Sequence, residues 1–456
     1  MAGTVAVRAK WVLLHEQEGA QPRLVEDRYV LVEGGRIRAI EPTRPQTDVV
    51  LEPMAGLVIP GFINLHAHSL NAPLFRGIID DLTPLPRAEN LIYRLLMPVG
   101  QLAMDVLAPE QLEALVEWGL REELVGGTTT VLDMWRPEQE GFFAAARRVG
   151  IRAYGAPYIR SRPILGIDDA GEPRFGADEG RRSLDAAVEL FRRHDQGPRG
   201  RLRVALAPHA TDTCSAELLA DVAAAAHDLD TAVTVHLGQS RSECAAVEGR
   251  HGIGPASLLA SVGLATPRTI AAHCLYLDDA QLQTLASGGA TVAHCPLTYA
   301  RAGISVTADR FWRNGVAMGI GTDAYAMDML AEMRMAGFFS KLATGRSDTA
   351  TAWSLLDAAT RVGADALGRP DLGRIAVGAT ADLAVFDLSG YHLEPVIDPV
   401  KSLVWYANAG DLHSVLVDGE VVHSREQDAA ASGLRSSVAE AADAVLAAAR
   451  SRGIAV

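Results

Sequence analysis

Hydrophobic and polar residues alternate in two different ways along the 456-residue chain. The first 57 residues hold short runs of branched side chains, such as Thr4–Arg8 and Tyr29–Val32, separated by turns such as 33–36. This spacing predicts a small antiparallel sheet. From residue 58 to about residue 372, short apolar runs alternate with helical stretches instead, which predicts parallel strands joined by crossover helices.

Four of the predicted strands of the middle segment end at or just before a histidine or an aspartate: His66 and His68, His236, His273 and Asp323. The predicted strands of this segment cover residues 58–68, Thr128–Leu132, Ile151–Tyr154, Arg203–Ala207, Ala232–His236, Thr269–His273, Ala290–His294 and 316–321. Parallel strands fit either a closed (β/α)8 TIM-like barrel or an open doubly wound sheet. The barrel is favoured, because a closed ring readily brings many carboxyl ends of strands around one centre.

The pattern changes again after about residue 373. Short strands are predicted at Ala381–Asp387 and Ser414–Val422, and the second contains an Asp-Gly hairpin signal at Asp418. We therefore expect a small β-sandwich domain built from residues 1–57 and 373–456, flanking a barrel domain of residues 58–372. An alanine-rich stretch, Ser436–Arg452, predicts an exposed or docking helix.

Composition and charge limit the classes of protein to which the chain can belong. Hydrophobic residues make up 48% and charged residues 21%, as in a soluble enzyme. The net charge of −14 with scattered arginines argues against a nucleic-acid partner. The start of the chain lacks the pattern of a signal peptide, and no apolar run reaches the length of about 18 residues that a membrane span needs. We expect a cytoplasmic protein with no membrane partner, and four isolated reduced cysteines agree with this.

Histidines and an aspartate at the strand ends suggest a metal site. Side chains alternate along a strand, so His66 and His68 point to the same face. Both could instead be core histidines held by ordinary hydrogen bonds. With His236 and Asp323, however, they supply nitrogen and oxygen ligands suited to zinc or ferrous iron. Such a cation lowers the pKa of a coordinated water to about 7.

The order of these motifs resembles the amidohydrolase superfamily, in the branch of aromatic deaminases and triazine hydrolases. The matching stretches are Pro60–His68, Leu74–Gly77, Gly126–Thr130, Ala207–Ala210, Val235–Leu237, Ala272–Cys274, Ala293–Pro296, Gly319–Asp323 and Leu372–Leu383. The resemblance covers nearly the whole chain. It implies one divalent metal, zinc or else iron, and a homodimer.

The resemblance also implies roles for the residues of the site. His66, His68, His236 and Asp323 would bind the metal, and His273 would hydrogen-bond the metal-bound water. Asp323 would accept the proton of that water, and His273 would stabilise charge on the developing oxygen.

The chain departs from this branch at Gln239. Relatives usually have His-x-x-Glu there, and the glutamate passes a proton to the substrate ring. A glutamine amide forms hydrogen bonds but does not shuttle protons. Asp323 would then do all proton transfers, or Glu243 would reach in from a helix, or the leaving group would need no protonation, as with a halide.

Further residues are expected around the pocket. His209, Arg76 and Trp135 are candidate substrate contacts together with Gln239, and Tyr158 is a candidate for stacking on a planar ring. His209 could equally hold other groups of the site, Arg76 could be a solvated surface residue, and the aromatic residues could fill the core. His294 is expected to be structural. Three charged residues that follow Asp323 are expected to cap and decorate the next helix; these residues are Asp328, Glu332 and Arg334.

Three functions are considered for a chain with these features. The first is a hydrolytic deaminase that replaces the amino group of a purine, pterin, pyrimidine or triazine by oxygen. The second is a hydrolase of another bond at the same site, such as a dechlorinating triazine hydrolase or a cyclic amide hydrolase. The third is a scaffold that has lost its chemistry, which the complete set of polar strand ends disfavours.

Overall fold

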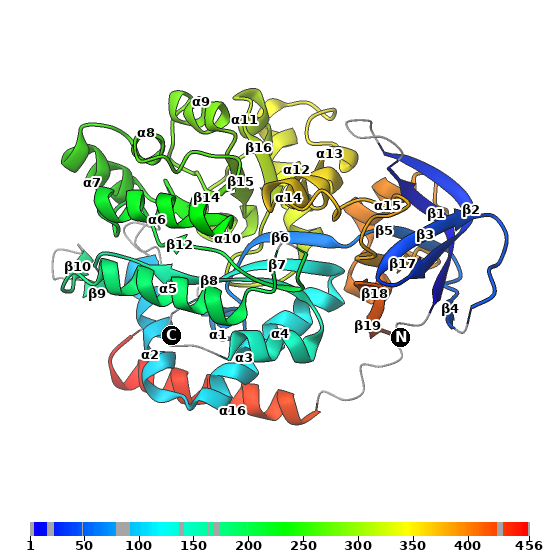
Figure 1. Cartoon of the computed structure of the whole chain (residues 1–456), viewed down its shortest axis with the longest axis horizontal. Coiled ribbons are helices and arrows are strands. Elements are labelled where there is room, and N and C mark those ends of the chain that lie inside the picture. The colour runs from blue at the N-terminus through cyan, green and yellow to red at the C-terminus, as the bar shows by residue number, and fades with distance from the viewer. Residues whose placement is uncertain are drawn as a thin grey trace.

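A barrel of parallel strands lies beside a smaller sheet formed by both ends of the chain (Figure 1). The structure is a computed structural model. It describes residues 4–15, 22–47, 49–78, 92–135, 141–162, 164–167, 173–197, 199–425 and 432–454.

The barrel consists of two hydrogen-bonded halves. Its strands are β6 (Phe62–Ala67), β7 (Thr128–Trp135), β8 (Arg152–Ile159), β11 (Leu202–Val204), β12 (Ala207–Pro208), β13 (Val233–Leu237), β14 (Thr269–His273), β15 (Thr291–His294) and β16 (Ala317–Ile320). Both β11 and β12 pair with β8 and together form one interrupted strand. Parallel bridges at Leu206–Val233 and Ala210–His236 join the halves, and Ala67–Asp323 closes the ring. The predicted (β/α)8 barrel is confirmed.

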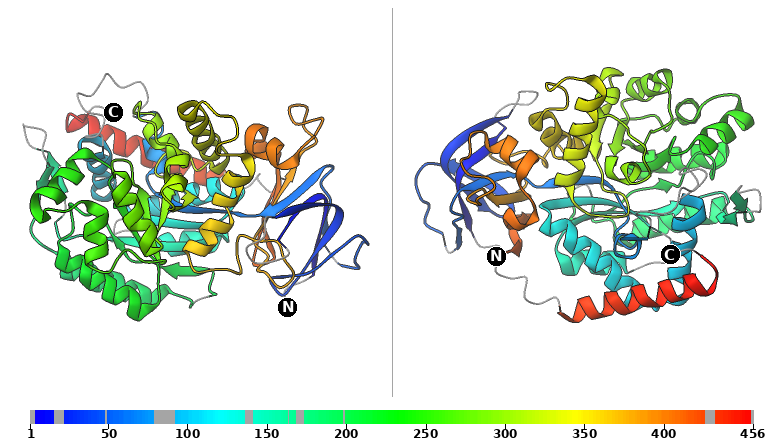
Figure 2. Two further views of the ribbon diagram at one scale, coloured as in Figure 1. Left: turned by 90° about the horizontal axis from the view of Figure 1, so that it is seen from above. Right: turned by 180° about the vertical axis from the view of Figure 1, so that it is seen from behind.

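Helices follow most barrel strands and cover the outside of the ring (Figure 2). They are α3 (Pro109–Val125), α4 (Phe142–Val149), α5 (Gly180–His194), α6 (Ala216–Leu229), α7 (Arg241–His251), α8 (Pro255–Ser261), α9 (Asp279–Gly288), α11 (Ala308–Arg313), α12 (Met329–Thr344), α13 (Ala352–Ala358) and α14 (Arg361–Ala366). Shorter segments lie beyond the carboxyl ends of the strands. These are α1 (Ala72–Phe75), the π-helix η2 (Ile92–Leu96), α2 (Met97–Val106), the hairpin β9 (Ile164–Ile167) and β10 (Pro173–Phe175), and α10 (Pro296–Ala300).

The second sheet has eight strands. In spatial order they are β19 (Glu420–Ser424), β18 (Leu412–Val417), β17 (Leu383–Asp387), β5 (Gly56–Pro60), β1 (Val5–Leu14), β2 (Arg23–Glu33) and β3 (Arg36–Glu41), with β4 (Val49–Leu51) also paired to β1. A bridge between Arg36 and Thr380 brings β3 to the segment that enters β17. The expected sandwich is therefore one continuous sheet that curls over its own apolar core. Both ends of the chain contribute to it, as predicted.

The apolar run from residue 58 to His68, interpreted from the sequence as one strand, is two strands. Its first part, β5, pairs with β1 and β17 in the small sheet, and β6 begins the barrel. The change falls at Gly61, later than the expected boundary between residues 57 and 58. A Cβ atom at Gly61 would lie 2.0 Å from the side chain of Thr129, so only glycine allows the two sheets to approach here.

The C-terminal segments pack on the two sheets in different ways. Helix α15 (Pro399–Tyr406) and the 3-10 turn η3 (Ala409–Asp411) connect β17 to β18. Helix α16 (Ser432–Ser451) instead lies along α2 and α3 (Figure 2), and it buries Val438, Ala441 and Val445 in the barrel's core. The predicted docking helix is confirmed. Across the described residues, none of the helices combines the length and apolar character that a membrane crossing requires.

A buried ion pair joins the small sheet to the base of the barrel. Arg152 of β8 is fully buried and donates to both oxygens of Asp382, at 2.8 and 3.1 Å. It also donates to Asp418 in the turn between β18 and β19. These carboxylates raise the pKa of Arg152 despite its burial, so the guanidinium is charged at any physiological pH.

Candidate metal centre and active-site pocket

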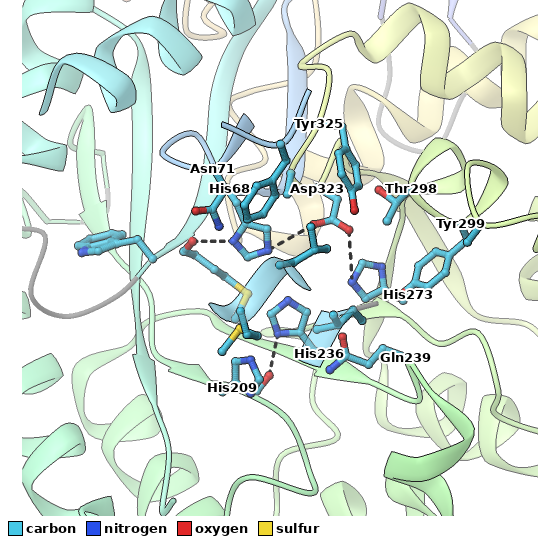
Figure 3. A pocket seen from close by; sticks show the side chains of 18 of the residues that line it. His68, Asn71, His209, His236, Gln239, His273, Thr298, Tyr299, Asp323 and Tyr325 are labelled. Carbon is cyan, nitrogen blue, oxygen red and sulfur yellow. Dashed lines mark hydrogen bonds and ion pairs between the residues drawn. The ribbon is translucent and has the colours of Figure 1, made fainter. Parts of the chain in front are cut away.

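Four histidines and one aspartate converge at the carboxyl ends of the barrel strands. Figure 3 shows His68, His236, His273 and Asp323 of this set. Strand β6 supplies His66 and is followed directly by His68, and His236 and His273 lie at the ends of β13 and β14. Asp323 follows β16. All five side chains are buried. The structure thus brings together the residues that the sequence placed at separate strand ends.

The distances define a compact centre. Asp323 Oδ1 lies 3.4 Å from His68 Nε2 and 3.9 Å from His66 Nε2, and its Oδ2 lies 3.9 Å from His273 Nε2. Two overlapping groups have ligand atoms within 4.8 Å of one another, and both include His66. His236 and His273 complete one group, and His68 and Asp323 complete the other. His273 is therefore as close to the centre as the four expected ligands.

Hydrogen bonds orient two of the imidazole rings. His68 Nδ1 donates to the carbonyl of Met134 at 2.7 Å, and His236 Nδ1 donates to the carbonyl of His209 at 2.8 Å. With the hydrogen on Nδ1, the lone pair on Nε2 points into the cluster. Neither ring nitrogen of His66 has a hydrogen-bond partner among the described residues, although both are buried. A buried polar atom without a partner is costly unless another group binds it.

The protonation state of the cluster suits a cation. Burial and the neighbouring imidazoles lower the pKa of His66 and His273 well below the usual range, and they lower that of His236 to about 3. Neutral imidazole is the form that binds zinc or iron. The donor set, its burial and the unpartnered nitrogens of His66 therefore fit a divalent metal ion.

The backbone at this centre is strained. His273 and Asp323 have φ angles of 75° and 59°, and Cys274 has 52°, in the left-handed region that disfavours residues with a Cβ. Such strain persists where the surrounding structure imposes it, commonly at functional sites. The sequence gives no signal for it.

A buried amide behind the cluster ties two strand ends together. Asn64 Nδ2 donates to Glu123 Oε1 at 2.6 Å and to Thr322 Oγ1 at 2.7 Å. Its Oδ1 accepts from the backbone N–H groups of His66 and Thr322, both at 3.2 Å. Asn64 thus fixes the backbone next to Asp323 as well as His66. The sequence analysis missed it, because only its position in the strand just before His66 points to it.

Gln239 lines the pocket beside the cluster, as predicted, and its amide nitrogen is buried without a partner among the described residues. Glu243 lies behind it on α7. The Glu243 carboxylate accepts from Gln239 N at 2.9 Å and from Thr211 Oγ1 at 2.6 Å, and it does not line the pocket. The expected possibility that Glu243 reaches in is therefore wrong, because both of its oxygens are engaged beneath Gln239.

Other predicted pocket residues divide into two sets. His209, Trp135 and Tyr158 line the pocket. Arg76 is not among the described lining residues: its guanidinium pairs with Glu122 and donates to the carbonyl of Tyr325, in agreement with the alternative of a surface residue. His294 is also absent from the lining and packs edge-on against Phe311, in agreement with a structural role.

The residues after Asp323 were predicted to cap and decorate α12. Asp328 caps it, since its carboxylate accepts from Ala331 N at 3.0 Å. Glu332 lies in the first turn of α12, is buried and accepts from Leu297 N at 3.0 Å. Arg334 donates to the carbonyl of Val404 at 2.8 Å and thus links α12 to α15.

The pocket also contains residues that the sequence analysis did not single out. They are contributed by segments beyond the strand ends, whose position a single sequence does not reveal. The polar members are Asn71, Tyr276, Thr298, Tyr299 and Tyr325, and the apolar members include Leu70, Phe75, Ile92, Leu96, Met97 and Ile304.

Barrel, buried polar cluster and pocket together are the fold and site of a hydrolase of the TIM-barrel type, with a donor set that fits a divalent metal. The profile of the Amidohydrolase family matches residues 57–422. The chain belongs to this family, and the resemblance noted in the sequence is confirmed.

Relatives of known name agree with this assignment. The chain is 33% identical over 418 residues to a 5-methylthioadenosine/S-adenosylhomocysteine deaminase of Nitratidesulfovibrio vulgaris, covering 89% of this chain and 90% of that protein. It is 31% identical over 403 residues to the protein of the same name from Pyrococcus abyssi, covering 86% and 88%. An adenosine deaminase structure from Xanthomonas campestris with bound zinc has a TM-score of 0.84 and 27% identity, covering 97% of this chain and 98% of that one.

Proposed function

We propose that this protein is a hydrolytic deaminase that replaces the exocyclic amino group of a nitrogen heterocycle by oxygen and releases ammonia. The converging cluster of His66, His68, His236, His273 and Asp323 carries the proposal. Relatives named as deaminases of adenine nucleosides support it, and they favour a purine among the possible heterocycles.

In this proposal His66, His68, His236 and Asp323 hold one zinc ion. When bound, such a cation makes water nucleophilic at neutral pH by lowering its pKa. The second oxygen of Asp323 faces His273 and is placed to accept a proton from the attacking water. Burial lowers the pKa of His273 and keeps its imidazole neutral. The imidazole hydrogen-bonds the oxygen atom of the substrate ring on which negative charge develops.

Gln239 occupies the position at which relatives usually have a glutamate. Its amide can hydrogen-bond a ring nitrogen, but it does not move a proton. With Glu243 held beneath it, Asp323 is the remaining carboxylate in the described lining of the pocket. We therefore assign the proton transfers of the reaction to Asp323.

The same observation favours a second candidate. A leaving group that departs without protonation, such as a halide, would make a glutamate at position 239 unnecessary. Gln239→Glu separates the two functions. We expect it to raise ammonia release if the native substrate is an amine, and to abolish the native reaction if the glutamine is adapted to another leaving group.

Two measurements test the leading proposal. Metal analysis of the purified protein should give one zinc per chain. Zinc-loaded protein should release ammonia from at least one compound in a panel of aminopurines, adenine nucleosides, pterins, aminopyrimidines and aminotriazines. Stoichiometric zinc with no ammonia from any compound contradicts the deaminase proposal, and protein that binds no zinc contradicts the metal centre.

We also propose a homodimer and a cytoplasmic location. The outer faces of α12 and α15 expose Phe338, Leu342 and Tyr406, which are 49%, 80% and 64% exposed. Clustered exposed apolar side chains favour an interface. Free thiols at all four cysteines suit a reducing compartment. Light scattering of the wild type and of Leu342→Glu tests the dimer, which the substitution should weaken.

A further inference from the structure

The pocket has a polar floor and an apolar wall. The floor is formed by the strand ends that carry the histidine cluster. The wall comes from η2, α2 and the segment after α10, and its side chains Ile92, Leu96, Met97 and Ile304 are only half-buried. Apolar side chains left partly exposed in a pocket gain free energy when a ligand covers them.

A hydrogen bond fixes this wall to the barrel. Tyr93, which follows Ile92 in η2, is buried and donates from its hydroxyl to Asp212 Oδ2 at 2.9 Å. Asp212 lies in the loop between β12 and α6, beside the strand end that carries His209. The apolar wall is therefore held in place over the floor and forms a defined part of the pocket.

The described part of the lining contains no lysine or arginine side chain. Of the described residues that line the pocket, none is a lysine, an arginine or a glutamate, and Asp323 belongs to the metal cluster. Arg241 and Arg301 lie over the rings of Tyr276 and Tyr325, 4.8 and 5.3 Å from the ring centres, and neither arginine lines the pocket. A carboxylate or ammonium group bound here would lose its hydration without gaining an ionic partner from the described lining.

The available hydrogen-bonding groups are neutral. The Gln239 amide nitrogen and the Tyr299 hydroxyl are buried without partners in the described structure. Both line the pocket next to His273 (Figure 3). They suit the polar edge of an uncharged ring.

We propose that the pocket selects a neutral heterocycle bearing an apolar substituent, and that it discriminates against substituents that carry a carboxylate or ammonium group. Gln239 and Tyr299 hydrogen-bond the ring, and the wall around Leu96 and Met97 covers the substituent. This inference rests on the proposed function, because it concerns the substrate of the same site. The relatives are named for two substrates, 5-methylthioadenosine and S-adenosylhomocysteine. The inference predicts that this protein prefers the first, because a methylthio group is neutral whereas a homocysteine group is zwitterionic.

A substituent series tests the selection with zinc-loaded protein. We expect kcat/KM for ammonia release from 5′-alkylthioadenosines to rise about fourfold for each methylene from methyl to propyl. S-adenosylhomocysteine, with the same thioether and a charged end, should be slower than 5′-methylthioadenosine by about 100-fold or more. Equal or faster turnover of S-adenosylhomocysteine overturns the inference.

Calorimetric measurement of ligand binding tests the selectivity of the pocket independently of the proposed deaminase reaction. If no nucleoside releases ammonia, the deaminase proposal fails, and binding of aminotriazines with propyl or carboxyethyl substituents still tests the pocket. Tighter binding of the propyl compound by about tenfold or more supports the inference. Equal binding of the two compounds, or no binding of either, overturns it.

Variants locate the selectivity in the wall. Leu96→Arg should shift the preference by about tenfold or more toward the carboxyethyl compound, because it supplies the missing ionic partner. Met97→Lys provides a second test if the first variant does not fold. Met54→Arg, at an 84% exposed position between β4 and β5 of the small sheet, is the matched control and should leave the preference unchanged. An unchanged preference in a folded wall variant overturns the assignment.

Discussion

Replacement of Arg152 by methionine should destabilise the protein strongly. The guanidinium is fully buried and makes two hydrogen bonds to Asp382, one to Asp418 and one to the carbonyl of Gly200 at 3.0 Å. Without it, the Asp382 carboxylate stays buried and, among the described residues, keeps the N–H of Asp418 as its hydrogen-bond donor, at 2.8 Å. Removing one partner of a buried ion pair costs about 3–5 kcal/mol, because the other charge is left uncompensated. We expect Arg152→Met to lower the free energy of unfolding by that amount.

Urea unfolding followed by circular dichroism measures this loss. Arg346→Met is the matched control, since its partner Asp348 and Arg346 itself are 66% and 64% exposed, and the loss of stability there should be close to the error of the measurement. The double variant Arg152→Met with Asp382→Asn should recover part of the loss by removing the stranded charge. A loss for Arg152→Met no larger than that of the control would refute the reasoning.

Three further predictions concern the site. Burial raises the pKa of Glu123 from 4.5 to about 8. The folded protein therefore retains a proton that the unfolded chain releases, and stability should fall by up to about 1.4 kcal/mol per pH unit between these two pH values. Glu123→Gln should flatten that part of the stability profile in urea unfolding at several pH values, and an unchanged slope would contradict the prediction. Asn64→Ala should weaken zinc binding by about 10- to 100-fold in chelator competition, because the backbone at His66 loses its support; affinity equal to the wild type would exclude this role. Asp323→Asn should lower kcat for ammonia release by about 10²- to 10⁴-fold in zinc-loaded protein, and a smaller loss would move the proton transfers to another group.

Local patterns predicted most of the strands. The turn at residues 33–36 and the Asp418-Gly419 pair form hairpins, with positive φ at both Asp418 and Gly419. The run from residue 58 was misinterpreted as one strand because its hydrophobicity is continuous across Gly61. Only the pairing of its two parts with different strands shows that the chain leaves one sheet there and enters another.

The candidate site was predictable in part, because residue types at the strand ends belong to the local pattern. Histidine and aspartate at strand ends are visible in the sequence, and a closed barrel places all such ends at one rim. The partners of Arg76, Glu243 and Glu332 were not predictable, because each lies on another segment of the chain. Glu122 pairs with the first, Thr211 binds the second and Leu297 binds the third.

By itself, the sequence determined the alternation of elements, the set of possible metal ligands and the replacement of an acid by Gln239, because these depend on residue type and local spacing. The tertiary structure decided which of these residues meet, how the buried network around Asn64 supports them, and that an apolar wall faces the polar floor. These features arise from contacts between segments distant in the chain, and a periodic pattern contains no information about which distant segments become neighbours.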